Sequence, residues 1–195
     1  SFCTTNPESL KFNKKYKISY IPNPVDISFE NLKVYNNKDP EFDLFFAMSH
    51  GVHRGILKKG KFDSRLILIE KLIKKNPHLK FNIHGAYNKQ PIWSDDFKDS
   101  LYQTKMALNL SQGKSVKYYS SDRVAQLVGN GILTFINVNT GLNDFFTNKE
   151  MVFYKNLDDL SEKIIRISND EKLRKTIGKN GKKKYFKHFN SSLVA

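Results

Sequence analysis

A basic, glycine-bearing stretch at 49–61 is the first part of the sequence whose residues could hold an anion. Glycine lets the backbone approach a phosphate closely, an arginine fork matches two phosphate oxygens, and a lysine adds a point charge. The glycine spacing and the Lys-Ser/Thr pair of a Walker loop are absent, so a diphosphate site and a solvated basic loop both remain open. The candidate residues are His50, Gly51, Arg54, Lys59 and Lys61.

A second basic stretch, at 111–123, leads directly into a predicted helix. The N–H groups at a helix N-terminus and the positive end of the helix dipole attract phosphate, although an ordinary capped helix would have the same sequence. The candidate residues here are Ser120, Ser121, Asp122 and Arg123. Because both stretches follow predicted strands, they favour a common crevice for an anionic, nucleotide-type ligand.

Histidine spacing and net charge bear on which other ligands to expect. His50 and His53 have the spacing of a metal-binding pair, but no cysteine or further histidine stands near them, so we expect no metal. The formal charge of +14 is compatible with nucleic acid, an anionic membrane face, phosphorylated small ligands or a general lysine-rich composition. No nucleic-acid-binding signature is present, and we do not expect nucleic acid as a partner.

The elements that must position these stretches alternate between strand and helix. Hydrophobic periodicity predicts strands at 42–48, 80–84, 106–110, 132–136 and 151–154, and helices at 64–75, 95–102, 121–128, 157–168 and 171–186. Such alternation requires crossover connections, and therefore a parallel sheet with helices on both faces. The predicted fold class is α/β, a Rossmann-like doubly wound parallel sheet, whose ligands sit at the carboxyl ends of the strands.

Composition indicates a globular chain without a membrane span. No apolar run approaches the roughly 20 residues that cross a bilayer, and the lone Cys3 fits a reducing compartment, so we expect a cytoplasmic location. Near the C-terminal end we predict a basic, aromatic surface that docks another domain or makes peripheral contact with an anionic membrane at its inner face. Its members are Lys182, Lys183, Lys184, Tyr185, Phe186 and Lys187.

Two motifs carry a resemblance to a known family. The segment 21–26, IPNPVD, resembles the IPNGVD segment with which many GT-B glycosyltransferases cross from acceptor domain to donor domain. The segment 121–131, SDRVAQLVGNG, is similar to the SxRxxEalaxG hallmark of bacterial spore-maturation-like glycosyltransferases. The chain thus resembles the C-terminal, donor-binding domain of a group 1 or spore-maturation-protein-like GT-B glycosyltransferase.

The resemblance implies roles for the candidate residues. Arg54 with Lys59 or Lys61 would hold the donor diphosphate and help it leave, beside the glycine loop that contains His50 and Gly51. The helix start at 120–122 would lie under the phosphates, and the donor base would be read within 85–97. Gln126 stands where the family usually has a glutamate that grips the ribose diol, and an amide can both accept from and donate to hydroxyls.

The same resemblance implies an organisation and an activity. Residues 1–40 would be the interdomain linker and the end of a missing N-terminal acceptor domain, and 41–190 the nucleotide-sugar-binding domain. The expected function is metal-independent and cofactor-free transfer from a UDP- or GDP-sugar to a glycan or lipid-linked acceptor in cell-surface polysaccharide synthesis. The fragment alone would be inactive. A nucleotide-sugar epimerase, a non-catalytic nucleotide-binding partner of the same fold, and a basic nucleic-acid-binding module are the alternatives.

Overall fold

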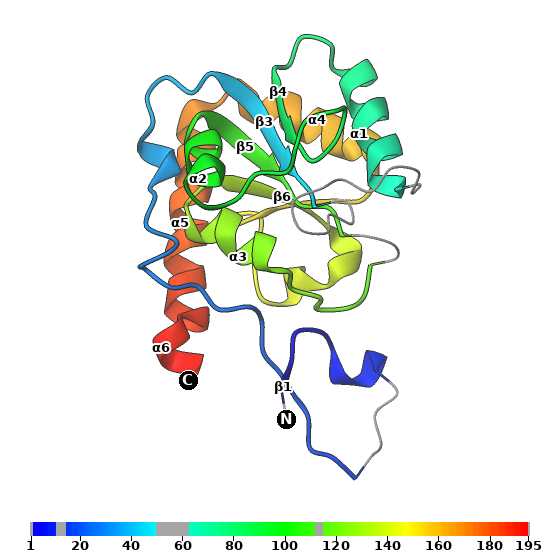
Figure 1. Ribbon diagram of the computed structural model, residues 1–195, viewed down its shortest axis with the longest axis vertical. Helices are drawn as coiled ribbons and strands as arrows, with labels where there is room; N and C mark the ends of the chain where they lie inside the picture. The colour runs from blue at the N-terminus through cyan, green and yellow to red at the C-terminus, as the bar shows by residue number, and fades with distance from the viewer. Residues whose placement is uncertain (1, 11–14, 50–62, 112–114, 195) are drawn as a thin grey trace.

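A five-stranded parallel sheet forms the centre of the computed structural model, which describes residues 2–10, 15–49, 63–111 and 115–194 (Figure 1). Its strand order is β4-β3-β5-β6-β7. The strands are β3 (Phe42–Ala47), β4 (Phe81–His84), β5 (Thr104–Leu108), β6 (Leu133–Asn137) and β7 (Val152–Tyr154). The helices are α1 (Ser64–Lys75), α2 (Ser94–Tyr102), α3 (Asp122–Gly129), α4 (Leu157–Ser168), α5 (Glu171–Phe189) and α6 (Ser191–Val194).

Both faces of the sheet are covered, because its strands carry apolar side chains on each side. In β3, Leu44 and Phe46 point to one face and Phe45 and Ala47 to the other, and all four are buried. The first pair belongs to a core shared with α1 and α4, and the second to a core shared with α2 and α3. The α/β doubly wound fold class is therefore confirmed.

Local capping explains why several helices begin where the sequence predicts. Asp63, Asn156 and Asp170 precede α1, α4 and α5, and each side chain accepts a hydrogen bond from an N–H of the first turn. Helix α5 extends three residues beyond the predicted end at Phe186. The reason is tertiary: Phe189, at the true end, packs edge-on against other aromatic rings of the core.

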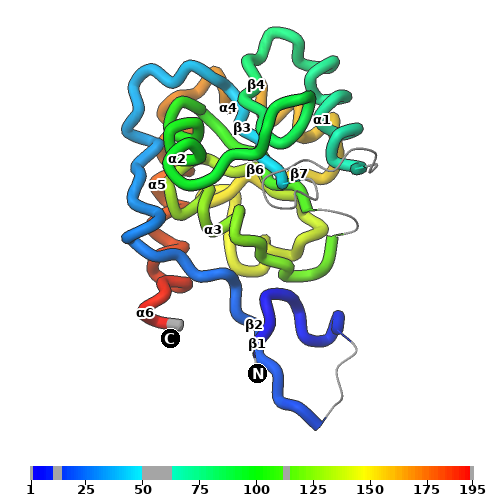
Figure 2. Tube along the Cα trace, in the orientation of Figure 1, coloured from blue at the N-terminus to red at the C-terminus, as the bar shows by residue number. Residues whose placement is uncertain are grey.

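The polar lead-in is built against this domain, although the sequence predicts no elements there. It contains two short parallel strands, β1 (Phe2–Cys3) and β2 (Ser19–Tyr20), and the 3-10 turns η1 (Pro7–Ser9) and η2 (Val34–Asn36). Val25 pairs with the chain after α5, donating to the Phe189 carbonyl at 2.8 Å, and the Tyr185 hydroxyl donates to the Asn23 carbonyl at 2.9 Å. The lead-in thus runs along α5 and α3 (Figure 2).

The predicted basic, aromatic surface at 182–187 is only partly a surface. Tyr185 is buried, with 1% of its area exposed. The Lys182 ammonium donates to the carbonyls of Glu30, Leu32 and Gly129, at 2.6, 2.9 and 2.7 Å. These two residues hold the lead-in to the domain, and the expectation that they face a partner or a membrane is corrected.

We expect Lys182→Met to lower the free energy of unfolding by about 2–3 kcal/mol, because three carbonyls, one at the end of α3, lose a charged donor. The cost is smaller than three separate bonds would give, since burial lowers the pKa of Lys182 to about 8 and so opposes its charge. Urea unfolding measures the change. Lys183→Met, at an exposed position one residue later, is the control and should change stability by under about 0.5 kcal/mol. Equal effects of the two changes would contradict the anchoring role.

Within the described residues, no helix combines the length and the apolar character needed to cross a bilayer.

Candidate functional site

The strand order creates a crevice between β3 and β5. β3 pairs with β4 on one side and with β5 on the other, so the connections that leave these strands diverge at their carboxyl ends. Open parallel sheets bind ligands at such a switch point. A pocket of about 740 Å³ opens there, a volume typical of small-molecule sites. We call it the switch-point pocket.

Three distant parts of the chain form the walls of the switch-point pocket. One wall is the end of β3 with the residues that follow it, and a second is the segment 91–98 that leads into α2. The third is the first turns of α3, and the lead-in closes the rim with residues 28–30. The site therefore depends on the sheet, on a helix N-terminus and on the lead-in together.

Arg123 is the principal charge on the α3 wall. Its guanidinium donates to the Leu110 carbonyl at 3.0 Å. Among the described residues, no carboxylate forms an ion pair with it. Burial, reinforced by the nearby positive charge of Arg65, lowers the pKa of Arg123 to about 10, which still leaves the group charged at neutral pH. A partly buried cation that has no ion pair within the described part of the chain suits an anionic ligand, although the neighbouring Asp122 offsets part of its charge.

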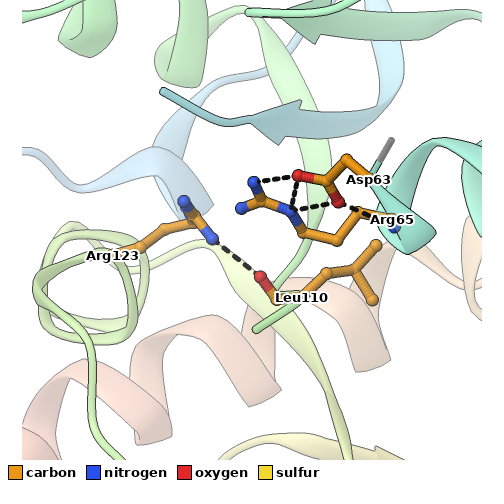
Figure 3. A network of polar contacts seen from close by, with 4 residues as sticks. All are labelled: Asp63, Arg65, Leu110 and Arg123. Atoms are coloured by element: carbon orange, nitrogen blue, oxygen red, sulfur yellow. Dashed lines mark hydrogen bonds and ion pairs between the residues drawn. The ribbon is translucent and has the colours of Figure 1, made fainter. Parts of the chain in front are cut away.

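Arg65, in contrast, has its own counter-ion. Its guanidinium contacts both carboxylate oxygens of Asp63, with the shortest N–O distance 2.6 Å, and both residues are buried (Figure 3). The Asp63 carboxylate is thus paired with Arg65, while the charge of Arg123 is offset at longer range by Asp122. The described lining carries both signs of charge, Lys98 and Arg123 against Glu30 and Asp122, so the affinity for an anion depends on the position of Arg123 rather than on net charge.

Helix α3 adds its N-terminus to the same wall. The Ser121 side chain makes no capping hydrogen bond, so it does not occupy the N–H groups of the first turn. Asp122 instead accepts from the Asn23 amide at 2.7 Å, which links the helix start to the lead-in. Gln126 is exposed, lines the pocket and offers both an acceptor and a donor to a ligand hydroxyl.

The structure brings four of the predicted site residues together and separates another. Ser121, Asp122, Arg123 and Gln126 all line the switch-point pocket. Ser120 does not. It is 1% exposed, its N–H donates to the Thr4 carbonyl, and its carbonyl accepts from Asn23, so its contacts are structural. The predicted residues His50, Gly51, Arg54, Lys59 and Lys61 lie outside the described residues.

Aromatic side chains form one wall of the pocket, and none of them was predicted from the sequence as a site residue. Trp93 is 53% exposed and Phe29 is 67% exposed, yet both line the pocket, as do Ile92 and Phe97. Exposed aromatic rings beside a cation suit a planar base. A tryptophan in a loop after a strand was a visible signal in the sequence. Phe29 had none, because only the fold brings the lead-in to this rim.

A Ser-His cluster elsewhere does not form a hydrolase site. The His84 Nε2 atom lies 2.8 Å from Asn82 Oδ1 and 2.7 Å from Ser100 Oγ. A catalytic triad uses both ring nitrogens, one toward the nucleophile and one toward the orienting group, whereas both contacts here involve one nitrogen. Burial also lowers the pKa of His84. Among the described side chains, no group of three or more His, Cys, Asp or Glu is arranged to hold a metal ion.

The fold is similar to that of several solved glycosyltransferase-type structures. TarM matches with a TM-score of 0.57 and 14% identity, over 82% of this chain and 34% of that one. Sucrose-phosphate synthase from Thermosynechococcus elongatus matches with a TM-score of 0.60 and 15% identity, over 91% and 50%. A mutant of S. aureus TarM in complex with Fondaparinux, alpha-GlcNAc-glycerol and UDP matches with a TM-score of 0.63 and 14% identity, over 96% and 39%.

These likenesses cover a limited part of the related molecules. The chain spans between about a third and a half of the length of the solved structures it matches. None of the curated proteins matches the chain.

The family model described as glycosyl transferase-like matches residues 65–194, which is more than half of the chain and includes the α3 wall of the pocket. With the Rossmann-like half of a GT-B fold and this match, the chain belongs to the glycosyl transferase-like family.

Proposed function

We propose that the switch-point pocket binds a nucleoside diphosphate sugar, with UDP or GDP as the nucleotide. The observation that carries the proposal is Arg123, a cation without a described counter-ion on the wall of a pocket at a helix N-terminus. A diphosphate supplies the missing negative charge, and the aromatic wall with Trp93 supports a base. The presence of UDP in the S. aureus TarM complex, a structure of the same fold, agrees with this ligand class.

The proposed reaction is sugar transfer to the hydroxyl of a glycan or lipid-linked acceptor in cell-surface polysaccharide synthesis. The bond between the anomeric carbon and the diphosphate oxygen breaks, its electron pair stays on the diphosphate, and the acceptor oxygen bonds to the sugar. Arg123 and the N-terminus of α3 would stabilise the developing charge, a role that does not call for a metal ion. Arg54, Lys59 and Lys61 are proposed as further diphosphate contacts, on their sequence alone.

The acceptor site is proposed to belong to another domain. The described walls of the switch-point pocket come from this sheet, its helices and the lead-in, and the acceptor hydroxyl with any base that takes its proton would come from the opposite side. We therefore expect the 195 residues to bind the donor without transferring sugar. Peripheral contact with an anionic membrane remains a proposal for the exposed lysines of α5.

Titration calorimetry of UDP and GDP into the 195-residue chain tests the nucleotide proposal. We expect at least one of them to bind, with equal affinity in EDTA and in magnesium. Gln126→Ala should weaken that nucleotide roughly 2- to 10-fold, the cost of a neutral hydrogen bond to the ribose, and leave inorganic pyrophosphate unaffected.

The matched control is Gln103→Ala, an exposed glutamine after α2 and outside the pocket. It should change neither affinity. Absence of UDP and GDP binding at millimolar concentration would overturn the proposed function, and equal effects of the two substitutions would remove Gln126 from the site.

A further inference from the structure

A second pocket, of about 210 Å³, lies at the carboxyl ends of β5, β6 and β7. Asn109 and Leu110 line it after β5, Asn137 at the end of β6, and Tyr154 at the end of β7, while the first turns of α1 contribute Arg65 and Leu68. We call it the β5–β7 pocket. No residue assigned above to the nucleotide lies in it, so its polar groups need another explanation.

Asn109 is the residue of this pocket whose side-chain oxygen is buried without a hydrogen-bond partner in the protein. Its backbone N–H donates to the Phe135 carbonyl and so continues the pairing of β5 with β6. Its side chain is buried, with 5% of the residue exposed, and its Oδ1 atom has no hydrogen-bond partner. A buried acceptor left unpaired costs roughly 1–3 kcal/mol, so such a group calls for a ligand that pairs with it.

The chemistry of the wall indicates which kind of ligand pairs with Asn109. An amide oxygen accepts a hydrogen bond, so the ligand must bring a donor, and an anionic phosphate oxygen brings none at neutral pH. Among the described residues that line this pocket, the cation is Arg65, and it is ion-paired with Asp63. The pocket therefore suits a neutral group with hydroxyls rather than a second phosphate.

The two pockets meet at one residue. Leu110 lines the β5–β7 pocket, and its carbonyl accepts from Arg123, which lines the switch-point pocket (Figure 3). A diphosphate bound at Arg123 would place its outer substituent beside the β5–β7 pocket. At about 30 Å³ for each water molecule, 210 Å³ holds roughly seven waters, enough for a monosaccharide-sized group and too little for a whole nucleotide sugar.

We propose that the β5–β7 pocket is the subsite for the sugar of the donor, and that Asn109 Oδ1 accepts a hydrogen bond from a sugar hydroxyl. The inference rests on the proposed function, because it takes the diphosphate to bind at Arg123. It adds a specificity-determining residue, Asn109, whose buried acceptor is paired with a hydroxyl when the sugar is bound.

Saturation-transfer NMR on the 195-residue chain tests the subsite, because one ligand reports on both pockets. The probes are UDP-glucose, UDP-N-acetylglucosamine and GDP-mannose. In the wild type we expect saturation of base and sugar protons for at least one probe. Asn109→Leu removes the acceptor, and Leu68→Phe fills the pocket from α1 while Asn109 itself is kept. Each should lower the ratio of sugar to base saturation at least threefold, while the base signal persists.

Controls separate loss of the subsite from loss of the fold. Asn143→Leu, at an exposed position outside both pockets, should leave the ratio unchanged. Asn109→Leu should melt no lower than the wild type, because it removes an unpaired buried acceptor.

Three outcomes would overturn the proposal. An unchanged ratio in both pocket variants, with the base signal intact, would overturn the subsite and leave the nucleotide site standing. Methyl α-glucopyranoside that is saturated equally with and without UDP would assign the pocket to free saccharide instead. Absence of saturation for every probe in the wild type would overturn the proposed function and the subsite with it.

Discussion

Replacing Arg123 with methionine is expected to weaken the binding of UDP or GDP roughly ten- to a hundredfold. The guanidinium reaches the switch-point pocket, and charge-assisted hydrogen bonds to a phosphate contribute about 1.5–3 kcal/mol. Arg123→Lys should recover only part of the affinity, since a point charge replaces the planar fork. Titration calorimetry at two salt concentrations measures the loss, which should be smaller at high salt because screening weakens the wild-type interaction.

The substitution Arg123→Met is expected to leave the fold intact. Arg123 is a partly buried cation beside Arg65, so removing it relieves repulsion while giving up one bond to the Leu110 carbonyl. The melting temperature of Arg123→Met should therefore be no more than slightly below that of the wild type. Arg166→Met, at an exposed arginine on α4, is the matched control and should alter neither affinity nor stability. Equal nucleotide affinity in wild type and Arg123→Met would place the diphosphate elsewhere.

Gly85→Ala is expected to lower the free energy of unfolding by about 3–5 kcal/mol. Gly85 follows β4 with φ +75°, a conformation that L side chains rarely adopt, and an added Cβ would lie 1.7 Å from the carbonyl oxygen of Met48. The positive φ costs about 1–3 kcal/mol, and the overlap with backbone adds a similar amount because neither strand end can move freely. Urea unfolding of wild type and variant measures the difference.

Gly141→Ala separates the cost of the positive φ from the cost of the overlap between the added Cβ and the backbone. Gly141 also has a positive φ, +71°, but its nearest neighbours are side-chain atoms of Lys117 and Tyr118 at 3.1 and 3.2 Å, which can shift. We expect it to cost about 1–2 kcal/mol. Equal costs at the two glycines would show that the close approach of Gly85 to Met48 is absent. Because Met48 also lines the switch-point pocket, a Gly85 variant that folds should bind nucleotide more weakly.

Part of the fold could be predicted from local signals. Helix α1 begins and ends where the sequence predicts, because Asp63 caps its start and Asn76-Pro77 ends it, and α4 begins after the cap Asn156. The strands were predicted within two residues at each end, since their apolar runs are short and bounded by turn residues. Caps, helix stops and strand ends depend on residues a few positions apart, so they can be predicted from the sequence.

The sequence also predicts which stretches could hold an anion, but not which of their side chains meet. Arg123 was predicted because it falls at the start of a helix that follows a strand, and Gln126 because it stands at the family's ribose-binding position; both line the pocket. Ser120, adjacent to them, is buried against the lead-in instead. Side-chain type does not distinguish a serine that faces a ligand from one that faces Asn23, because that partner is 97 residues away along the chain.

Strand order, and with it the site, was decided only by the tertiary structure. Parallel strands pair through crossovers, so placing β3 between β4 and β5 is a long-range choice that no short pattern encodes. That choice brings Arg65 beside Arg123 and pairs Asp63 with Arg65, so that Arg123 has no ion pair among the described residues. It also turns Lys182 inward and leaves the Asn109 acceptor buried without a partner. Composition and spacing determined the fold class and the family resemblance, while long-range packing set the electrostatic balance of the site.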